Sequence, residues 1–203
     1  KKVHFSKTNP KTRELILPPE EVRPSLRTYT HRGIDLKNNH LIVDFVNHGE
    51  NGSASYWALH AEIGDELGVA MKLKDAPLHP QADWFFFIGD ATALPVISCI
   101  LEALPKDAKG KVLLEIPTKN DEQSLVKPEG IDISWIYNEH PENGSELAVL
   151  VKQIELPYVD SKFAYVAAEF ATVKELRQYF RKELEWSSSE LYAYSYWKAG
   201  VAE

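Results

Sequence analysis

Cysteine is almost absent from this chain, and this limits the disulfides and metal sites that the protein can form. One cysteine among 203 residues, Cys99, excludes an internal disulfide and favours a reducing, cytoplasmic location. Cys99 stands in the apolar run 96–101, where a small buried core residue is the default interpretation. The seven histidines form no His-x-x-x-His pair and have no cysteine partner, so we expect no metal site built by the protein.

Long apolar runs and an excess of positive charge are also missing. No stretch is long enough to span a bilayer, and no basic-then-apolar leader opens the chain, so we expect no membrane partner. The net charge of −7 argues against general affinity for nucleic acid. The first residue is lysine rather than methionine, and residues 1–5 resemble the inside of a strand, so we expect an N-terminal portion to precede them.

The residues before about position 80 are rich in predicted strands. The expected elements are strands over 41–46 and 64–71 and a helix over 53–61. Ser53 or Ser55 would cap the start of this helix, and Gly64 its end. The proline-bearing segment 76–80 predicts a boundary between two domains, 1–80 and 81–203.

Beyond the boundary, predicted strands and helices alternate. The predicted strands cover 84–88, 111–116, 131–136, 162–168 and 192–197, and the predicted helices cover 94–104, 146–154 and 172–184. The strand 84–88 is apolar throughout, which is typical of a parallel strand covered on both faces. The alternation predicts an α/β domain around a parallel sheet. Tyr192, Tyr194 and Tyr196 predict one packed face of the last strand.

The segment Arg27-Thr28-Tyr29-Thr30-His31-Arg32 points most directly to a ligand. If it is a strand, Arg27 and Tyr29 lie on one face. An arginine can hold a phosphate through two donors, a phenol can cover the face of a ring, and Thr30 can bond to a ring heteroatom. A flavin dinucleotide is such a ligand. Arg-x-Tyr-Thr is also an ordinary surface-strand sequence, and the segment alone leaves that alternative open.

Two polar clusters follow predicted strands of the second domain, at 89–92 and 168–170. Open parallel sheets bind ligands at the carboxyl ends of their strands. A small residue before a helix N-terminus also suits a nucleotide, although each cluster could equally be a capped helix start. The dinucleotide fingerprint G-x-G-x-x-G is missing, and so is the G-x-S-x-G turn of the α/β-hydrolases.

Five stretches, taken in order, resemble the siderophore-interacting protein family. They are Arg27-Thr28-Tyr29-Thr30-His31-Arg32, Asp44-Phe45-Val46-Asn47-His48-Gly49, Gly52-Ser53-Ala54-Ser55-Tyr56-Trp57-Ala58, Gly89-Asp90-Ala91-Thr92-Ala93-Leu94-Pro95 and Tyr196-Trp197-Lys198-Ala199-Gly200. Each stretch is weak alone, but five in the family's order are specific. The resemblance implies a ferredoxin-reductase-like fold, in which an antiparallel β-barrel flavin domain precedes an α/β parallel-sheet nucleotide-binding domain.

The same resemblance implies an FAD-dependent NAD(P)H ferric-siderophore reductase with non-covalent FAD. Arg27, Tyr29 and Thr30 would hold the phosphate, the ring face and the ring edge. The remaining implied FAD residues are Arg32, Asp44, His48, Ser53, Ala54, Ser55 and Trp57, with 53–55 offering backbone donors at a helix N-terminus. The implied residues beside NADPH or NADH are Asp90, Thr92 and Glu169. Those for the anionic siderophore are Lys198 and Trp197, with His31 or Arg32.

The implied reaction passes electrons from the nucleotide through FAD to the Fe(III) of a siderophore. Reduction loosens the iron, because hard anionic oxygen ligands hold Fe(III) better than Fe(II). Ala91 and Ala168 stand where the family usually has Glu and often Gly, and reduced ferredoxin is an alternative donor. Two other classes stay open: a carrier that binds flavin or iron chelates without turnover, and a flavin electron-transfer module with another acceptor.

Overall fold

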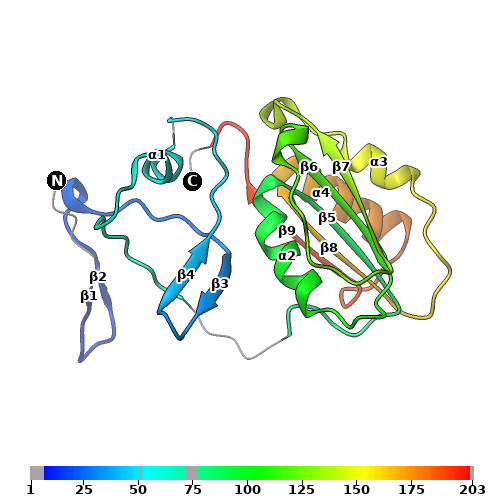
Figure 1. Ribbon diagram of the computed structural model, residues 1–203, viewed down its shortest axis with the longest axis horizontal. Coiled ribbons are helices and arrows are strands. Elements are labelled where there is room, and N and C mark those ends of the chain that lie inside the picture. Colours follow the sequence, from blue (N-terminus) through cyan, green and yellow to red (C-terminus); the bar gives the residue numbers. More distant parts are fainter. Residues whose placement is uncertain (1–6, 51, 72–76, 202–203) are drawn as a thin grey trace. The chain divides into compact units, whose positions relative to one another are not determined.

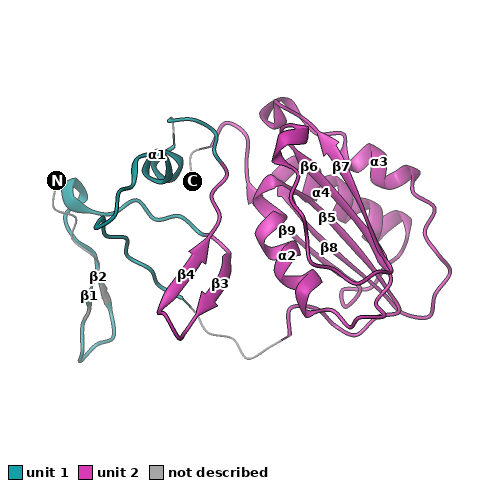
Figure 2. Ribbon diagram, viewed as in Figure 1, with its two compact units in different colours: residues 1–28, 47–75 teal, residues 29–46, 76–203 magenta. Residues whose placement is uncertain are grey.

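The computed structural model describes residues 7–50, 52–71 and 77–201. The chain divides into two compact units, one made of Lys1–Thr28 and Asn47–Asp75 and the other of Tyr29–Val46 and Ala76–Glu203 (Figure 2). The motif 27–32 is therefore shared between the two units. The predicted boundary segment 76–80 lies partly outside the described residues, so the domain limits 1–80 and 81–203 stay a prediction.

The first unit contains few regular elements. Two short antiparallel strands, β1 (Lys7–Thr8) and β2 (Leu15–Ile16), precede the 3-10 turn η1 (Glu20–Val22). The predicted strand 64–71 is wrong, because the described residues there form no strand. Leu67, Val69 and Met71 are each about half exposed, so this segment lacks the buried face that would fix a strand.

The helix α1 (Ser53–His60) confirms the helix that was predicted for 53–61. The prediction of its caps is wrong. Gly52 precedes the first turn without a side-chain cap, and Ala61 rather than Gly64 ends the helix. Ser55 cannot serve as the cap because its buried hydroxyl donates to the carbonyl oxygen of Gly49, 2.7 Å away, and thereby ties the helix to the preceding loop.

Five parallel strands form the centre of the second unit, as predicted. They are β5 (Trp84–Asp90), β6 (Gly110–Ile116), β7 (Ile131–Tyr137), β8 (Lys162–Glu169) and β9 (Leu191–Trp197), in the spatial order β7-β6-β5-β8-β9 (Figure 1). Asp90 at the end of β5 is in register with Glu115 on β6, and Gly89 with Ala167 on β8. The carboxyl ends of these strands therefore meet at one edge of the sheet.

Helices cover both faces of this sheet. Phe85 and Phe87 of β5 pack in a core with α2 (Leu94–Ala103), whereas Phe86 and Ile88 pack with α3 (Leu147–Gln153) and α4 (Phe170–Gln178). The predicted helices are thus confirmed, although α4 passes at Tyr179–Glu183 into a π-helical turn, η5. Short 3-10 turns complete the connections: η2 (Ala91–Ala93), η3 (Lys119–Asp121) and η4 (Pro141–Asn143).

An antiparallel hairpin, β3 (His31–Asp35) and β4 (His40–Val43), belongs to the same unit as the sheet. Both strands are shorter than predicted. The ladder opens at the pair His31 and Val43, and the described residues just outside that pair form no further ladder. Residues 27–30 are therefore not strand, and the prediction that Arg27 and Tyr29 share a strand face is wrong.

The hairpin β3-β4 lies against α2. Cys99 of α2 places its Sγ 3.5 Å from the carbonyl oxygen of Arg32 and 3.7 Å from that of His31. Cys99 is half-buried rather than the fully buried core residue that was predicted, and its thiol faces the hairpin. In the part of the chain that the structure describes, no helix is both long enough and apolar enough to cross a bilayer.

Candidate functional site

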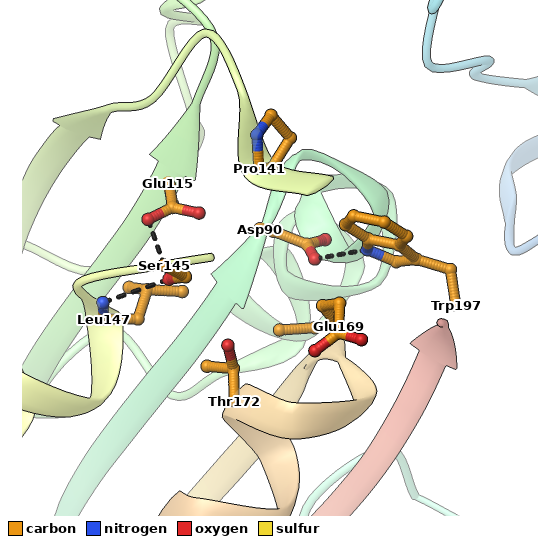
Figure 3. Close-up of a pocket in the computed structure, with 9 residues that line it drawn as sticks. Asp90, Glu115, Pro141, Ser145, Leu147, Glu169, Thr172 and Trp197 are labelled. Carbon is orange, nitrogen blue, oxygen red and sulfur yellow. Dashed lines mark hydrogen bonds between the residues drawn. The ribbon is translucent and has the colours of Figure 1, made fainter. Parts of the chain in front are cut away.

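A polar pocket lies where the carboxyl ends of the strands meet (Figure 3). Strand ends, the loops after them and the first turns of α3 and α4 supply its lining residues, which are Asp90, Glu115, Pro141, Ser145, Leu147, Ala168, Glu169, Thr172 and Trp197. This is the edge at which open parallel sheets place their ligands. Asp90, Glu169 and Trp197 were predicted site residues, and the structure brings them together here.

Asp90 ends β5 and is one of two buried carboxylates of the pocket, with 5% of its surface exposed. Its Oδ1 accepts hydrogen bonds from the backbone N–H and the hydroxyl of Thr92, and its Oδ2 accepts one from the indole Nε1–H of Trp197 at 2.7 Å. Burial raises the pKa of Asp90, while these hydrogen bonds pull it back down. Asp90 thus fixes both the start of η2 and the last residue of β9.

Glu115 is a site residue that the sequence analysis missed. Its carboxylate accepts a hydrogen bond from the hydroxyl of Ser145 at 2.8 Å, and that hydroxyl oxygen accepts the N–H of Leu147 at 3.1 Å, at the start of α3. Burial raises the pKa of Glu115, and the negative charge of Asp90 raises it further. Its place in the sequence could have identified it, because Glu115 stands near the end of a predicted strand just as Asp90 does.

Glu169 connects the end of β8 to the C-terminal segment. Its carboxylate caps α4 by accepting the N–H of Ala171, and it also accepts the N–H of Ala199 at 3.2 Å. The ammonium of Lys198, between these contacts, lies 5.1 Å from the ring centroid of Phe170. The segment 197–199 is therefore held over the strand ends by contacts to Asp90, Glu169 and Phe170.

The pocket is acidic and tightly closed. Three carboxylates line it without a basic side chain, and the surrounding atoms leave no space of the size of a water molecule. Its floor includes Ala168, which is 1% exposed. Such a lining suits an uncharged ring or amide better than a phosphate.

Part of the predicted flavin set lies in the first unit, around α1. The N–H groups of Ser53, Ala54 and Ser55 precede the first donor of the helical ladder, Tyr56, which bonds to the carbonyl of Gly52 at 2.8 Å. The first turn carries no acidic residue, so the positive end of the helix dipole can meet an anion.

Gly52 allows the ring of His48 to lie directly over this helix start. A Cβ at Gly52 would stand 2.4 Å from His48 Cε1, so only glycine fits beneath the ring as it is placed. Arg27 is exposed, and its guanidinium donates to the adjacent carbonyl of Leu26 at 2.7 Å rather than to an acid. The uncapped helix end and the exposed cation fit the pyrophosphate of a dinucleotide. Trp57 is half-buried in α1.

The other predicted flavin residues lie in the second unit. Tyr29 is 42% exposed, and its ring lies 4.7 Å from that of Phe45 at 48°. Thr30 is half-buried just before β3. Asp44 is half-buried just after β4.

Arg32 already has a partner. Its guanidinium forms a bidentate ion pair with Glu102, in which Nη1 and Oε2 are 3.2 Å apart. This pairing raises the pKa of Arg32. Of the predicted siderophore cations, Arg32 is paired with Glu102, and the exposed Lys198 lies over the ring of Phe170. Within the described ranges no three His, Cys, Asp or Glu side chains gather as metal ligands would.

The chain combines two features: a helix whose uncapped N-terminus suits a dinucleotide, and after it a parallel sheet with a pocket at its strand ends. Together they define a two-domain protein of the ferredoxin-reductase-like class. Comparison with known families specifies it further. Residues 1–71 match the siderophore-interacting FAD-binding domain, and residues 82–200 match the siderophore-interacting protein model. The chain belongs to the siderophore-interacting protein family.

Individual proteins agree with this assignment. The chain is 36% identical over 184 residues to the ferric vibriobactin reductase of Vibrio cholerae, which covers 90% of this chain and 68% of the relative. It is 28% identical over 191 residues to the NADPH-dependent ferric-chelate reductase of Escherichia coli, covering 93% and 72% of the two chains. The crystal structure of a siderophore utilization protein from T. fusca superposes with a TM-score of 0.78 at 30% identity, covering 97% and 78%.

Proposed function

We propose that this chain is a flavin-dependent reductase that takes electrons from NADPH or NADH and reduces Fe(III) held by a siderophore. Bound FAD would accept a hydride and release electrons one at a time, and the protein's own residues supply position and electrostatics. Fe(II) would then leave the siderophore, because hard anionic oxygen ligands hold it weakly. The predicted cytoplasmic location belongs to the same proposal.

The main support for this proposal is that the two halves of the chain match the two family models in order, and that relatives over nearly the whole chain are named ferric reductases. The structure supports it with a separate feature in each unit. One unit has the uncapped start of α1, and the other has the pocket at the strand ends.

Each set of residues would have a distinct task. The N–H groups of 53–55 and the guanidinium of Arg27 would bind the phosphates of FAD, while Tyr29 would cover the ring and Thr30 would meet its edge. His48, over Gly52, and Asp44 would line the cleft, with Arg32 and Trp57 beside it. The closing segment 197–198 would face the anionic siderophore.

The pocket with Asp90 and Glu169, together with Thr92 that bonds to Asp90, would accept the nicotinamide side of the nucleotide. Its lining is acidic, so the phosphates of that nucleotide would stay outside it. The same closed, acidic lining gives a specific reason to test reduced ferredoxin as a second donor, because a protein donor would not need to enter the pocket. The name of the Escherichia coli relative favours NADPH.

Anaerobic turnover tests the proposal. The full chain is mixed with FAD, a nicotinamide nucleotide and a ferric siderophore, and both nucleotide oxidation and Fe(II) formation are followed. A reductase gives many turnovers that require all four components. A carrier gives at most one equivalent of change, and that result would overturn the proposal. Turnover with reduced ferredoxin but with neither nucleotide would mean that ferredoxin is the electron donor and that the protein is still a reductase.

Arg27→Ala provides a matched variant for the cofactor role. Loss of a charge-assisted contact to a phosphate weakens binding by about 10- to 100-fold. The control is Arg23→Ala, since Arg23 is an exposed arginine of the same unit that bonds to the carbonyl of Pro18. Equal FAD dissociation constants for the two variants would contradict the role of Arg27.

A further inference from the structure

Helix α2 meets the hairpin β3-β4 with one face and the sheet with the other. Cys99 and Glu102 are three positions apart, so they lie on the same side of the helix. Both contact Arg32 of β3, Cys99 through the backbone carbonyl and Glu102 through the guanidinium. The opposite side of α2 is buried in the core and carries Val96, Ile97, Ile100 and Leu101. The helix therefore joins the hairpin to the sheet within the second unit.

Arg32 is released from the regular ladder of the hairpin. His31 is in register with Val43. Gly33, two residues further along β3, is in register with Ile42, only one residue away on β4. Arg32 is therefore the extra residue of a β-bulge. Bulges redirect side chains and are common beside functional sites, and here the guanidinium of the bulged residue reaches α2.

The pair between Arg32 and Glu102 fixes an orientation as well as a distance. The distances Nη1–Oε2 and Nη2–Oε1 are 3.2 and 2.5 Å. Two parallel hydrogen bonds hold the guanidinium and the carboxylate in a defined arrangement, which a single contact does not. Glu102 stands in the last turn of α2, where a negative charge is unfavourable for the helix dipole. Its favourable contribution therefore comes from Arg32.

The two ends of α2 lead to the two halves of the proposed reaction. Before its start, Asp90 accepts hydrogen bonds from Thr92 in the turn η2, which runs directly into α2. Asp90 belongs to the pocket assigned to the nucleotide. Near the other end, Glu102 holds Arg32, which closely follows the flavin-ring segment 29–30. Because a packed helix moves as one piece, α2 relates the place of that segment to the place of the pocket.

We propose that Glu102 is a positioning residue that, through its pair with Arg32, sets where the flavin-ring segment 29–30 lies relative to the nucleotide pocket. This inference rests on the proposed reductase function, and Glu102 itself need not touch FAD or the nucleotide. Transfer between two bound groups depends steeply on their geometry, and a displacement of about 1 Å can cost about 100-fold in rate. Loss of the pair should therefore slow the transfer and leave both affinities unchanged.

Stopped-flow absorbance measures this transfer. The limiting rate of flavin reduction at saturating NADPH or NADH is recorded anaerobically for the FAD-loaded chain and for Glu102→Ala, in which alanine preserves the helix. The rate should fall about tenfold or more, while the dissociation constants for FAD and nucleotide stay within about twofold. Reduction by dithionite, which needs no nucleotide pocket, should not change. An unchanged limiting rate with the nucleotide would overturn the inference.

Glu175→Ala is the matched control. Glu175 on α4 pairs with Lys152 at 2.8 Å, and its side chain is partly exposed, as that of Glu102 is. The variant loses an ion pair of the same unit that does not involve the hairpin, so its limiting rate should equal that of the unaltered chain. An equal fall in the two variants would mean a general loss of stability and would overturn the inference.

Exchanging the two charges tests whether Glu102 acts through Arg32. Glu102→Arg alone should slow flavin reduction, because two guanidinium groups then face each other. Adding Arg32→Glu should restore at least about half of the lost rate, because the ion pair can form in the reverse sense. Absence of any recovery would mean that the effect of Glu102 does not pass through Arg32, which would overturn the inference.

Hydrogen exchange of the FAD-free chain gives a readout that does not depend on activity. Without a partly exposed ion pair the hairpin should open locally more often, so the backbone amides of β3 and β4 should exchange about two- to fivefold faster in Glu102→Ala. The same amides should be unchanged in Glu175→Ala. Equal exchange of the hairpin in the unaltered chain and in Glu102→Ala would overturn the inference.

Failure of the proposed function and failure of this inference give different results. If neither nucleotide reduces FAD in the unaltered chain, the proposed nucleotide-driven reaction fails and this inference fails with it. If the unaltered chain is reduced and Glu102→Ala is reduced at the same limiting rate, only the inference is wrong.

Discussion

Replacing Trp197 by phenylalanine would test how the C-terminal segment is fixed over the strand ends. The indole Nε1–H donates to Oδ2 of Asp90 at 2.7 Å, and Asp90 is 5% exposed. Phenylalanine keeps an aromatic ring but removes the donor, while Oδ1 keeps both hydrogen bonds from Thr92. The buried carboxylate is then left partly unsatisfied.

The expected loss follows from that contact. A hydrogen bond to a charged group contributes about 1.5–3 kcal/mol. For a chain of this size each kcal/mol changes the melting temperature by about 2–4 °C, so Trp197→Phe should lower it by roughly 3–12 °C. The bond from Trp197 also lowers the pKa of Asp90. The loss should therefore grow as the pH rises and Asp90 ionises.

Urea unfolding followed by circular dichroism measures the loss, and Trp135→Phe is the matched control. Trp135 lies on β7 and packs against the core beside α2, and its indole makes no hydrogen bond within the described part of the chain. The control reports the effect of the smaller ring alone. If Trp197→Phe lowers the free energy of unfolding no more than Trp135→Phe does, the structural role assigned to the Trp197–Asp90 bond is refuted.

Three further outcomes follow from the structure. Gly52→Ala should displace the ring of His48 and raise the FAD dissociation constant at least about threefold, which a titration with FAD measures. The same change should alter the free energy of unfolding by less than about 0.5 kcal/mol, as measured by urea unfolding. The pKa of Glu115 is raised in the folded state. As the pH rises above the ordinary pKa of a glutamate, about 4.3, ionisation of Glu115 therefore increasingly destabilises the folded state. Its contribution to the free energy of unfolding should fall over that range, and Glu115→Gln should flatten this dependence; equal slopes would refute the assignment. Glu102→Gln should cost about 0.2–1 kcal/mol, less at high salt, because its ion pair with Arg32 is partly exposed, and a salt-independent loss would argue against it.

The second unit could be predicted from the sequence because its strands are buried on both faces. A run such as Trp84 to Ile88 is apolar at every position, so it identifies a central parallel strand without knowledge of its neighbours. Periodicity failed where burial is slight. The residues 64–71 alternate like a strand but remain exposed, and the strand expected at 27–32 begins only at His31, where its pairing with Val43 begins.

The candidate site was only partly predictable for a different reason. Asp90 and Glu169 could be located because each follows a predicted strand and precedes a helix. Glu115 pairs with Ser145, 30 positions further along, and Asp90 bonds to Trp197, 107 positions away. Such partners depend on the order of strands in the sheet, which a single sequence does not specify.

One absorbance trace shows whether this chain works as a flavin-dependent siderophore reductase. The full chain is loaded with FAD, freed of excess flavin and kept anaerobic, and its visible flavin bands are followed while NADPH or NADH and then a ferric siderophore are added. We expect the bands to be retained, to fade when the nucleotide is added and to return with the ferric siderophore, while Fe(II) appears at the same rate. Bands that are not retained, or that stay faded after the ferric siderophore is added, would contradict a flavin-dependent siderophore reductase.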